Sequence, residues 1–156
     1  MRSASFRRLL DTNVLVYQHD PRDPSKQRTA IDLVARAGGD GRTALTTQIL
    51  TEFAWTAVRR LPLPMTPAQA GRQVGYFARV FGVLTVTPVA ILEALRAVDE
   101  YRLSFWDALI WGVARLNDVP LVLTEDLPGG RDAVEGVRYT NPFNPLFDLA
   151  RIGADL

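Results

Sequence analysis

The chain has 156 residues, 47% of them hydrophobic, which is enough for one domain to bury a core without disulfides or a structural metal. It contains no cysteine, so disulfide bonds and thiolate zinc sites are excluded, and any bound metal must be held by oxygen ligands. Its 18 basic and 17 acidic residues give a net charge of +1, which does not by itself indicate nucleic-acid binding.

The N-terminal segment MRSASFRRLLDTNVLVY is basic, but Asp11 and Asn13 interrupt the apolar run that an export signal needs. No other run reaches membrane-spanning length. We therefore expect a cytoplasmic protein with no membrane association. No internal repeat or linker divides the chain, so residues 1–156 are expected to form a single domain.

The first half of the chain predicts two strand–helix units. Leu9 and Leu10 end a short apolar strand that leads directly into Asp11. The turn-rich segment HDPRDPSK precedes a helix over about residues 26–36. A strand over residues 44–47 leads into a second helix, whose apolar residues repeat at helical spacing and which the LPLP segment ends.

The second half continues the alternation. Thr66 and Pro67 are typical of a helix start and predict a helix to about Val80. The later elements are a strand over 83–87, helices over 88–102 and 104–118, a buried strand over 120–124, an edge strand around 137–140 and a short terminal helix. The pattern predicts an α/β fold with a parallel sheet covered on both faces.

The helix that contains Asp107 is apolar from Phe105 to Ala114 except for that one carboxylate. Such a helix is expected to be buried on most sides, with Trp106 and Trp111 in its packing. A buried carboxylate needs a cation, hydrogen-bond donors or a metal. Ser104 also fits a helix cap with Asp107 at the third helical position, so a structural and a functional role both stay open.

Three further acids occur where they could join Asp107. Asp11 and Asp126 each follow a predicted strand, and either alone fits a simple turn, just as Glu52 alone fits a solvated helix face. The carboxyl ends of parallel strands lie along one edge of a sheet, however, so Asp11 and Asp126 can converge there. Repulsion within such a cluster would raise some of the pKa values unless a divalent cation lay between the acids.

An all-oxygen cluster selects hard ions, Mg²⁺ or Mn²⁺, which can activate water against a phosphodiester. Nucleases that work without metal need side chains for general acid and base catalysis, and the chain offers only His19 and Lys26. His19 lies in a turn-rich segment and is expected to be a surface residue, and Lys26 is expected to begin a helix. The residues therefore predict metal-dependent phosphodiester hydrolysis.

The segments DTNVLVY, LTEF, SFWDALI and LTEDLPGG, together with Asn141-Pro142-Phe143, resemble the PIN-domain family, and most closely the VapC-like toxins of toxin–antitoxin pairs. The resemblance implies a three-layer α/β/α sandwich around a central parallel sheet. It also implies an endoribonuclease that uses Mg²⁺ or Mn²⁺, forms a homodimer and is inhibited by a cognate antitoxin. Residues 144–156 extend beyond the usual ending as a short C-terminal extension.

By the same resemblance, Asp11, Glu52, Asp107 and Asp126 match the acidic positions that bind metal and catalyse. Thr12, Asn13 and Thr124 match supporting polar positions. Glu125 is adjacent to Asp126, and the family's T-x-D spacing favours Asp126 as the fourth acid.

Trp55 shares the helix face of Glu52 and is the better of the tryptophans for contact with RNA or a partner, and Arg59 lies on that face too. Three alternatives remain: a PIN-like nuclease that cuts DNA, a PIN-like module that only binds, and a receiver-like phosphoacceptor domain. The last needs a lysine late in the chain, whereas the only lysine is Lys26.

Overall fold

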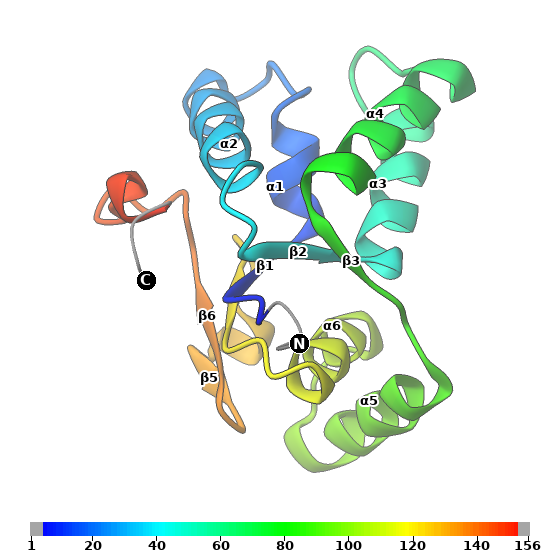
Figure 1. Ribbon diagram of the computed structural model, residues 1–156, viewed down its shortest axis with the longest axis vertical. Helices are drawn as coiled ribbons and strands as arrows, with labels where there is room; N and C mark the ends of the chain where they lie inside the picture. The colour runs from blue at the N-terminus through cyan, green and yellow to red at the C-terminus, as the bar shows by residue number, and fades with distance from the viewer. Residues whose placement is uncertain (1–4, 153–156) are drawn as a thin grey trace.

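The computed structural model describes residues 5–152, and its centre is one six-stranded sheet in the order β3-β2-β1-β4-β6-β5 (Figure 1). Every neighbouring pair is parallel except the last, β5 with β6. The strands are β1 (Arg8–Leu10), β2 (Thr43–Thr46), β3 (Gly82–Leu84), β4 (Leu121–Leu123), β5 (Ala133–Val134) and β6 (Val137–Thr140).

Helices cover both faces of the sheet, which gives three layers. In Figure 1, α1 to α4 lie on one side of the strands, and α5 and α6 lie together on the other. The helices are α1 (Thr12–Tyr17), α2 (Pro24–Ala37), α3 (Thr47–Arg59), α4 (Pro67–Val80), α5 (Pro88–Tyr101) and α6 (Phe105–Leu116), with short 3₁₀ turns η1 (Pro128–Gly130) and η2 (Leu149–Arg151). The predicted α/β/α sandwich is confirmed.

The central strands β1 and β2 are buried along their whole length because both of their faces are covered. Leu9 and Leu10 of β1 and Leu123 of β4 have no exposed surface. Trp111 of α6 is also fully buried, and its indole Nε1 donates a 3.0 Å hydrogen bond to the carbonyl of Val134, which ties α6 to β5. The predicted packing role of Trp111 is therefore confirmed.

Arg8 belongs to β1 although it is charged and fully buried. Its guanidinium forms an ion pair with Asp40 and donates a 3.0 Å hydrogen bond to Thr43 Oγ1. The carboxylate and hydroxyl satisfy a charge that would otherwise be costly in the interior. An arginine pair before two leucines made the start of this strand ambiguous in the sequence, and the distant partner at position 40 resolves it.

The predicted helix starts are well reproduced. Thr66 caps α4 with a complete capping box, and Ser104 caps α6 by accepting a hydrogen bond from the Asp107 amide. Helix α1, which was not predicted, begins at Thr12 after its cap Asp11 and includes the apolar residues Val14 to Val16. No helix within residues 5–152 is both long and apolar enough to cross a membrane.

The prediction of an edge strand at 137–140 was wrong in its position. β6 lies between β4 and β5, and β5 forms the edge. The two strands are joined by a tight turn in which Glu135 and Gly136 both have positive φ, 41° and 82°. Consecutive positive φ values suit a two-residue hairpin turn, but glutamate rarely adopts them, so this hairpin was difficult to predict from the residues alone.

Candidate active site

Asp11, Glu52, Asp107 and Asp126 line one cavity of about 390 Å³ at the carboxyl edge of the sheet. Asp11 follows β1, Glu52 lies in α3, Asp107 lies in the first turn of α6, and Asp126 follows β4. Four segments that are far apart in the sequence therefore meet around the same space. The convergence of Asp11 with Asp126 is what a parallel sheet dictates, since the carboxyl ends of its strands share an edge.

Asp11 is fixed by two short hydrogen bonds. Its Oδ1 accepts from the Thr12 amide at 2.6 Å, and its Oδ2 accepts from Thr124 Oγ1 at 2.7 Å. The first bond is the turn that the sequence suggested, and it caps α1. The same carboxylate thus begins a helix and faces the cavity, so the structural and functional readings are compatible.

Thr124 connects the polar residues that the sequence singled out as supports. Its hydroxyl donates to Asp11 and accepts from Asn13 Nδ2 at 3.2 Å and from the Asp126 amide at 3.1 Å. The side chain is buried, so these bonds are shielded from water. The orientation of Asp11 is therefore coupled to the loop that carries Asp126.

Glu52 is held by one predicted residue and one that the sequence analysis missed. Thr12 Oγ1 donates to Glu52 Oε2 at 3.0 Å, and Gln48 Nε2 donates to Glu52 Oε1 at 2.7 Å. The Gln48 amide also donates to the carbonyl of Trp106 at 3.1 Å, which links α3 to the start of α6. Gln48 precedes Glu52 by four residues, the spacing of neighbours on one helix face, and this was the available signal.

Asp107 combines the two roles that the sequence left open. Its Oδ2 accepts a 2.7 Å hydrogen bond from Ser104 Oγ, and its amide donates to the same hydroxyl at 3.2 Å. The carboxylate also lines the cavity with Asp11 and Asp126. The hydrogen bonds with Ser104 therefore hold the Asp107 side chain at the N-terminus of α6, next to the cavity.

Glu125 and Asp126 point to different surroundings. Glu125 accepts from the Tyr17 hydroxyl and forms an ion pair with Lys26. Asp126 is exposed and lines the cavity, which Glu125 does not. The geometry therefore agrees with the choice of Asp126 as the fourth acid.

Burial, together with the nearby charges of Glu52 and Asp107, raises the pKa of Asp11 from its ordinary 3.8 to about 6, although the hydrogen bonds from Thr124 and Thr12 act to lower it. Burial also raises the pKa of Tyr139, whose hydroxyl lies near Asp107 and Asp11 and has no hydrogen-bond partner within residues 5–152. The site thus concentrates negative charge, with five acids and one arginine, Arg22, around the cavity.

No three acidic or histidine side chains in the described part of the chain are close enough to hold one ion together. The donor set nevertheless fits a hard divalent cation, because all four positions offer carboxylate oxygens around one cavity and Asp11 lacks a positive partner. Asp11, Glu52, Asp107 and Asp126 are the residues that would hold it.

Two aromatic predictions need correction. Trp106 was expected in the core, but it is 61% exposed and lines a groove on the surface. His19 was expected at the surface, but it is partly buried with its ring centroid 5.9 Å from that of Phe53, and its Nε2 has no partner among residues 5–152.

Trp55 is 52% exposed and, together with Trp106, lines a groove of about 760 Å³ that shares Gln48 and Glu52 with the acidic cavity. Arg60 packs over the Trp55 ring at 4.6 Å from the centroid and lines this groove, whereas Arg59 is exposed but does not line it.

A family model for the PIN domain matches residues 8–127. The chain belongs to the PIN-domain family. The four acids lie within the matched residues, which are followed by η1, the β5–β6 hairpin and the C-terminal segment. PIN domains are nucleases that generally depend on divalent metal. No curated protein matches the chain as a sequence.

Solved structures share this fold. The VapC20 toxin of Mycobacterium tuberculosis, described as cleaving the sarcin–ricin loop, superposes with a TM-score of 0.58 at 18% identity, over 74% of this chain and 86% of that one. A toxin–antitoxin complex from Klebsiella pneumoniae gives 0.63 at 19%, over 86% and 97%. DNA-bound VapBC from Salmonella typhimurium gives 0.61 at 20%, over 88% and 98%.

Proposed function

We propose that the protein is a metal-dependent endoribonuclease and the toxin of a toxin–antitoxin pair. The observation that carries the proposal is the arrangement of Asp11, Glu52, Asp107 and Asp126 around one cavity at the sheet edge. Family membership supports nuclease chemistry, and the likeness of fold to VapC toxins supports RNA as the substrate.

In this proposal the four acids would hold Mg²⁺ or Mn²⁺. The bound ion would supply activation of water and stabilisation of the charge on the leaving oxygen. The chain's own polar residues orient the acids. Thr124 and Thr12 hold Asp11, Gln48 and Thr12 hold Glu52, and Ser104 holds Asp107. Asn13 acts through Thr124 and keeps its hydroxyl directed at Asp11.

From the acidic cavity, the RNA strand extends along the groove lined by Trp55 and Trp106. The exposed indole rings there can stack on bases of any sequence. Arg60, stacked on Trp55, presents its charge to phosphate, and Arg59 adds positive charge to the same end of α3. Single-stranded RNA suits this surface because its unpaired bases are free to stack on aromatic side chains.

A cognate antitoxin and a second copy of the chain are the proposed protein partners. Complexes of toxin with antitoxin are among the structures that share this fold, including that from Klebsiella pneumoniae. A homodimer is supported by an exposed apolar stripe on α5 formed by Val89, Ile91, Leu92 and Leu95. Contiguous apolar surface of this kind marks interaction sites.

The deciding experiment measures cleavage of single-stranded RNA by the purified, partner-free protein with Mg²⁺ or Mn²⁺, with EDTA, and after Asp107→Asn. Asp99→Asn on the exposed face of α5 is the matched control, since it removes the same charge away from the cavity. We expect cleavage that leaves 5′-phosphate and 3′-hydroxyl ends, is abolished by EDTA and by Asp107→Asn, and is unchanged in the control.

Cleavage that survives EDTA would refute the metal mechanism. A parallel assay with single-stranded and duplex DNA tests the alternative substrate, and cutting of DNA alone would replace RNA in the proposal. Absence of cleavage with every nucleic acid would favour a module that only binds.

A further inference from the structure

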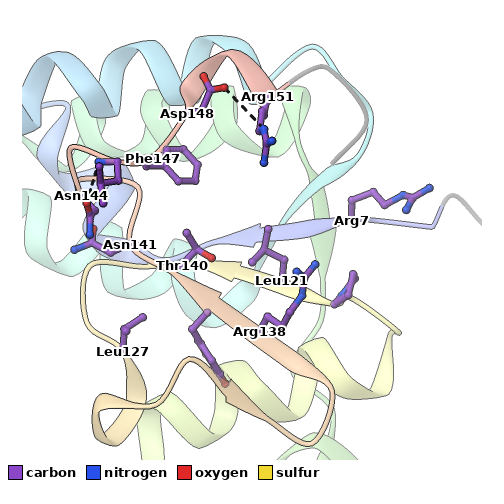
Figure 2. A pocket seen from close by; sticks show the side chains of 13 residues that line it. Arg7, Leu121, Leu127, Arg138, Thr140, Asn141, Asn144, Phe147, Asp148 and Arg151 are labelled. Atoms are coloured by element: carbon purple, nitrogen blue, oxygen red, sulfur yellow. Dashed lines mark hydrogen bonds and ion pairs between the residues drawn. The ribbon is translucent and has the colours of Figure 1, made fainter.

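A second pocket, of about 750 Å³, lies outside the acidic cavity on the other side of the loop that follows β4. Figure 2 shows it between β6 and the C-terminal segment, with Arg7, Arg138 and Arg151 around one end and Asn141, Asn144 and Phe147 around the other. The residues from Asn144 onward belong to the extension beyond the family's usual ending, and they form one wall. Of this extension, residues 153–156 lie outside the described structure.

The pocket has an excess of positive charge. Its lining includes three arginines but one acid, Asp148, which pairs with Arg151 at 3.8 Å where both side chains are largely exposed. In the described part of the chain, the side chains of Arg7 and Arg138 form no ion pair. Several other arginines have a close acid partner, such as Arg22 with Asp20 at 2.6 Å. Arginines that line a pocket and form no ion pair are suited to bind phosphate.

The acidic cavity has the opposite charge. Its lining includes five acids and one arginine, Arg22. Without a cation it repels a phosphate backbone, so RNA needs a positive surface elsewhere to be held. Besides the groove that contains Arg60, the arginine pocket is a second positive surface, and it meets the acidic cavity at the loop after β4, where Asp126 and Pro128 line the acidic side and Leu127 lines the arginine pocket.

We propose that the arginine pocket binds a nucleotide phosphate of the RNA substrate, away from the bond that is cut. This inference rests on the proposed ribonuclease function and adds an anchoring site to it. Arg7, Arg138 and Arg151 neutralise the phosphate, and the partly buried ring of Phe147 offers the attached base an apolar surface. A strand that crosses the Asp126–Pro128 loop reaches both pockets, so the extension contributes to substrate binding.

Binding is measured separately from cleavage by using Asp107→Asn as the background, because that variant is expected to hold RNA without cutting it. Fluorescence anisotropy of labelled single-stranded RNA is compared for this background, for the same protein with Arg138→Gln, and for the same protein with Arg72→Gln. Arg72 is exposed on α4 and does not line the pocket. Arg72→Gln therefore removes the same charge elsewhere and serves as the control.

We expect Arg138→Gln to weaken RNA binding about tenfold, as for loss of one hydrogen bond to a charged group. The slope of log affinity against log salt should fall by about 0.7, the value for one phosphate contact with a single strand. In the active protein, the KM for RNA should rise with kcat unchanged. Arg72→Gln should leave the affinity and KM unchanged, and Arg7→Gln should repeat the effect of Arg138→Gln.

Equal effects of Arg138→Gln and Arg72→Gln would overturn the inference even if RNA is cleaved. Binding that depends on Arg138 without any RNA cleavage would support the pocket and refute the nuclease proposal. The same titration with adenosine monophosphate distinguishes the source of the phosphate. Binding of the mononucleotide at Arg138, with no effect of that residue on RNA, would show a free-nucleotide site and overturn the assignment to the substrate.

Discussion

At the scale of single residues, Asp11 has to satisfy conflicting demands. It caps α1, accepts from Thr124, and lies close enough to Glu52 and Asp107 for their charges to raise its pKa. Its pKa rises from 3.8 to about 6, so the native protein holds a proton in this range that the unfolded chain releases. The contribution of Asp11 to the free energy of unfolding is therefore greatest below pH 4, and it is lost as the pH rises through 6.

Asp11→Asn should consequently stabilise the metal-free protein by about 2 kcal/mol at pH 7.5. Asparagine keeps the side-chain oxygen that caps α1 and removes the unfavourable charge. Urea unfolding in EDTA between pH 4 and 8 measures this, with Asp99→Asn as the control. The difference from wild type should shrink as the pH falls below 6, and a difference that does not change with pH would contradict the account.

Asp126→Asn should lower RNA cleavage at least about tenfold, since it removes a carboxylate from the cavity. Glu125→Gln should leave cleavage within about threefold of wild type, because that side chain faces Lys26 and Tyr17 instead. Initial rates for both variants under the same metal concentration decide between the neighbouring acids. The reverse ranking would show that Glu125 is the functional one.

At the scale of elements, the N-terminus of α6 serves both folding and the site. Ser104→Ala should cost about 1 kcal/mol of unfolding free energy through loss of the cap, and should also lower cleavage because Asp107 loses a hydrogen-bond donor. Thr87→Ala removes the equivalent cap of α5, far from the acids in the sequence. Thr87→Ala should lower the free energy of unfolding by a similar amount and leave cleavage unchanged. An equal loss of activity in both variants would contradict the role of Ser104 in positioning Asp107.

The packing of α5 on α6 depends on a close approach at Gly112. A Cβ at this position would lie 2.9 Å from the backbone oxygen of Ala90, which cannot move away as a side chain could. Gly112→Ala should therefore cost about 1–3 kcal/mol despite the better helix propensity of alanine. Gly71→Ala in α4, where nothing lies within 4 Å, should be neutral or stabilising by up to about 1 kcal/mol. Thermal unfolding of both variants checks the contrast.

The sequence predicted these elements well where the signal was local. Thr66 with Pro67 marked the start of α4, and the buried run at 121–123 gave β4. It failed where distant partners decided the outcome. Trp106 is exposed although the rest of α6 after its first turn is largely buried, and β6 is internal because the Glu135–Gly136 turn joins it to β5, which forms the edge. The four acids were predicted from motif and strand position, and the structure places them around one cavity. Gln48 was missed although it lies four residues before Glu52, and its bond to the Trp106 carbonyl joins segments far apart in the sequence.

At the scale of the whole molecule, the exposed stripe on α5 predicts association. Leu92 is 66% exposed near the middle of this stripe, so Leu92→Glu should convert a homodimer to a monomer by placing charge in an apolar interface. Leu63→Glu, at an exposed position in the loop before α4, is the control and should keep the native mass. Light scattering after size-exclusion chromatography measures both. A wild-type monomer, or a Leu92→Glu dimer, would contradict this interface.

The position of β1 also governs when the protein can become active. β1 lies between β2 and β4, and the amide of Asp11 donates to the carbonyl of Leu123. A chain growing on the ribosome therefore exposes Asp11 early but cannot fix it until β4 has emerged, more than a hundred residues later in synthesis. Under the proposed function, the ribonuclease would therefore stay inactive towards its own messenger RNA until Asp126, the last of the four acids to be translated, has been made.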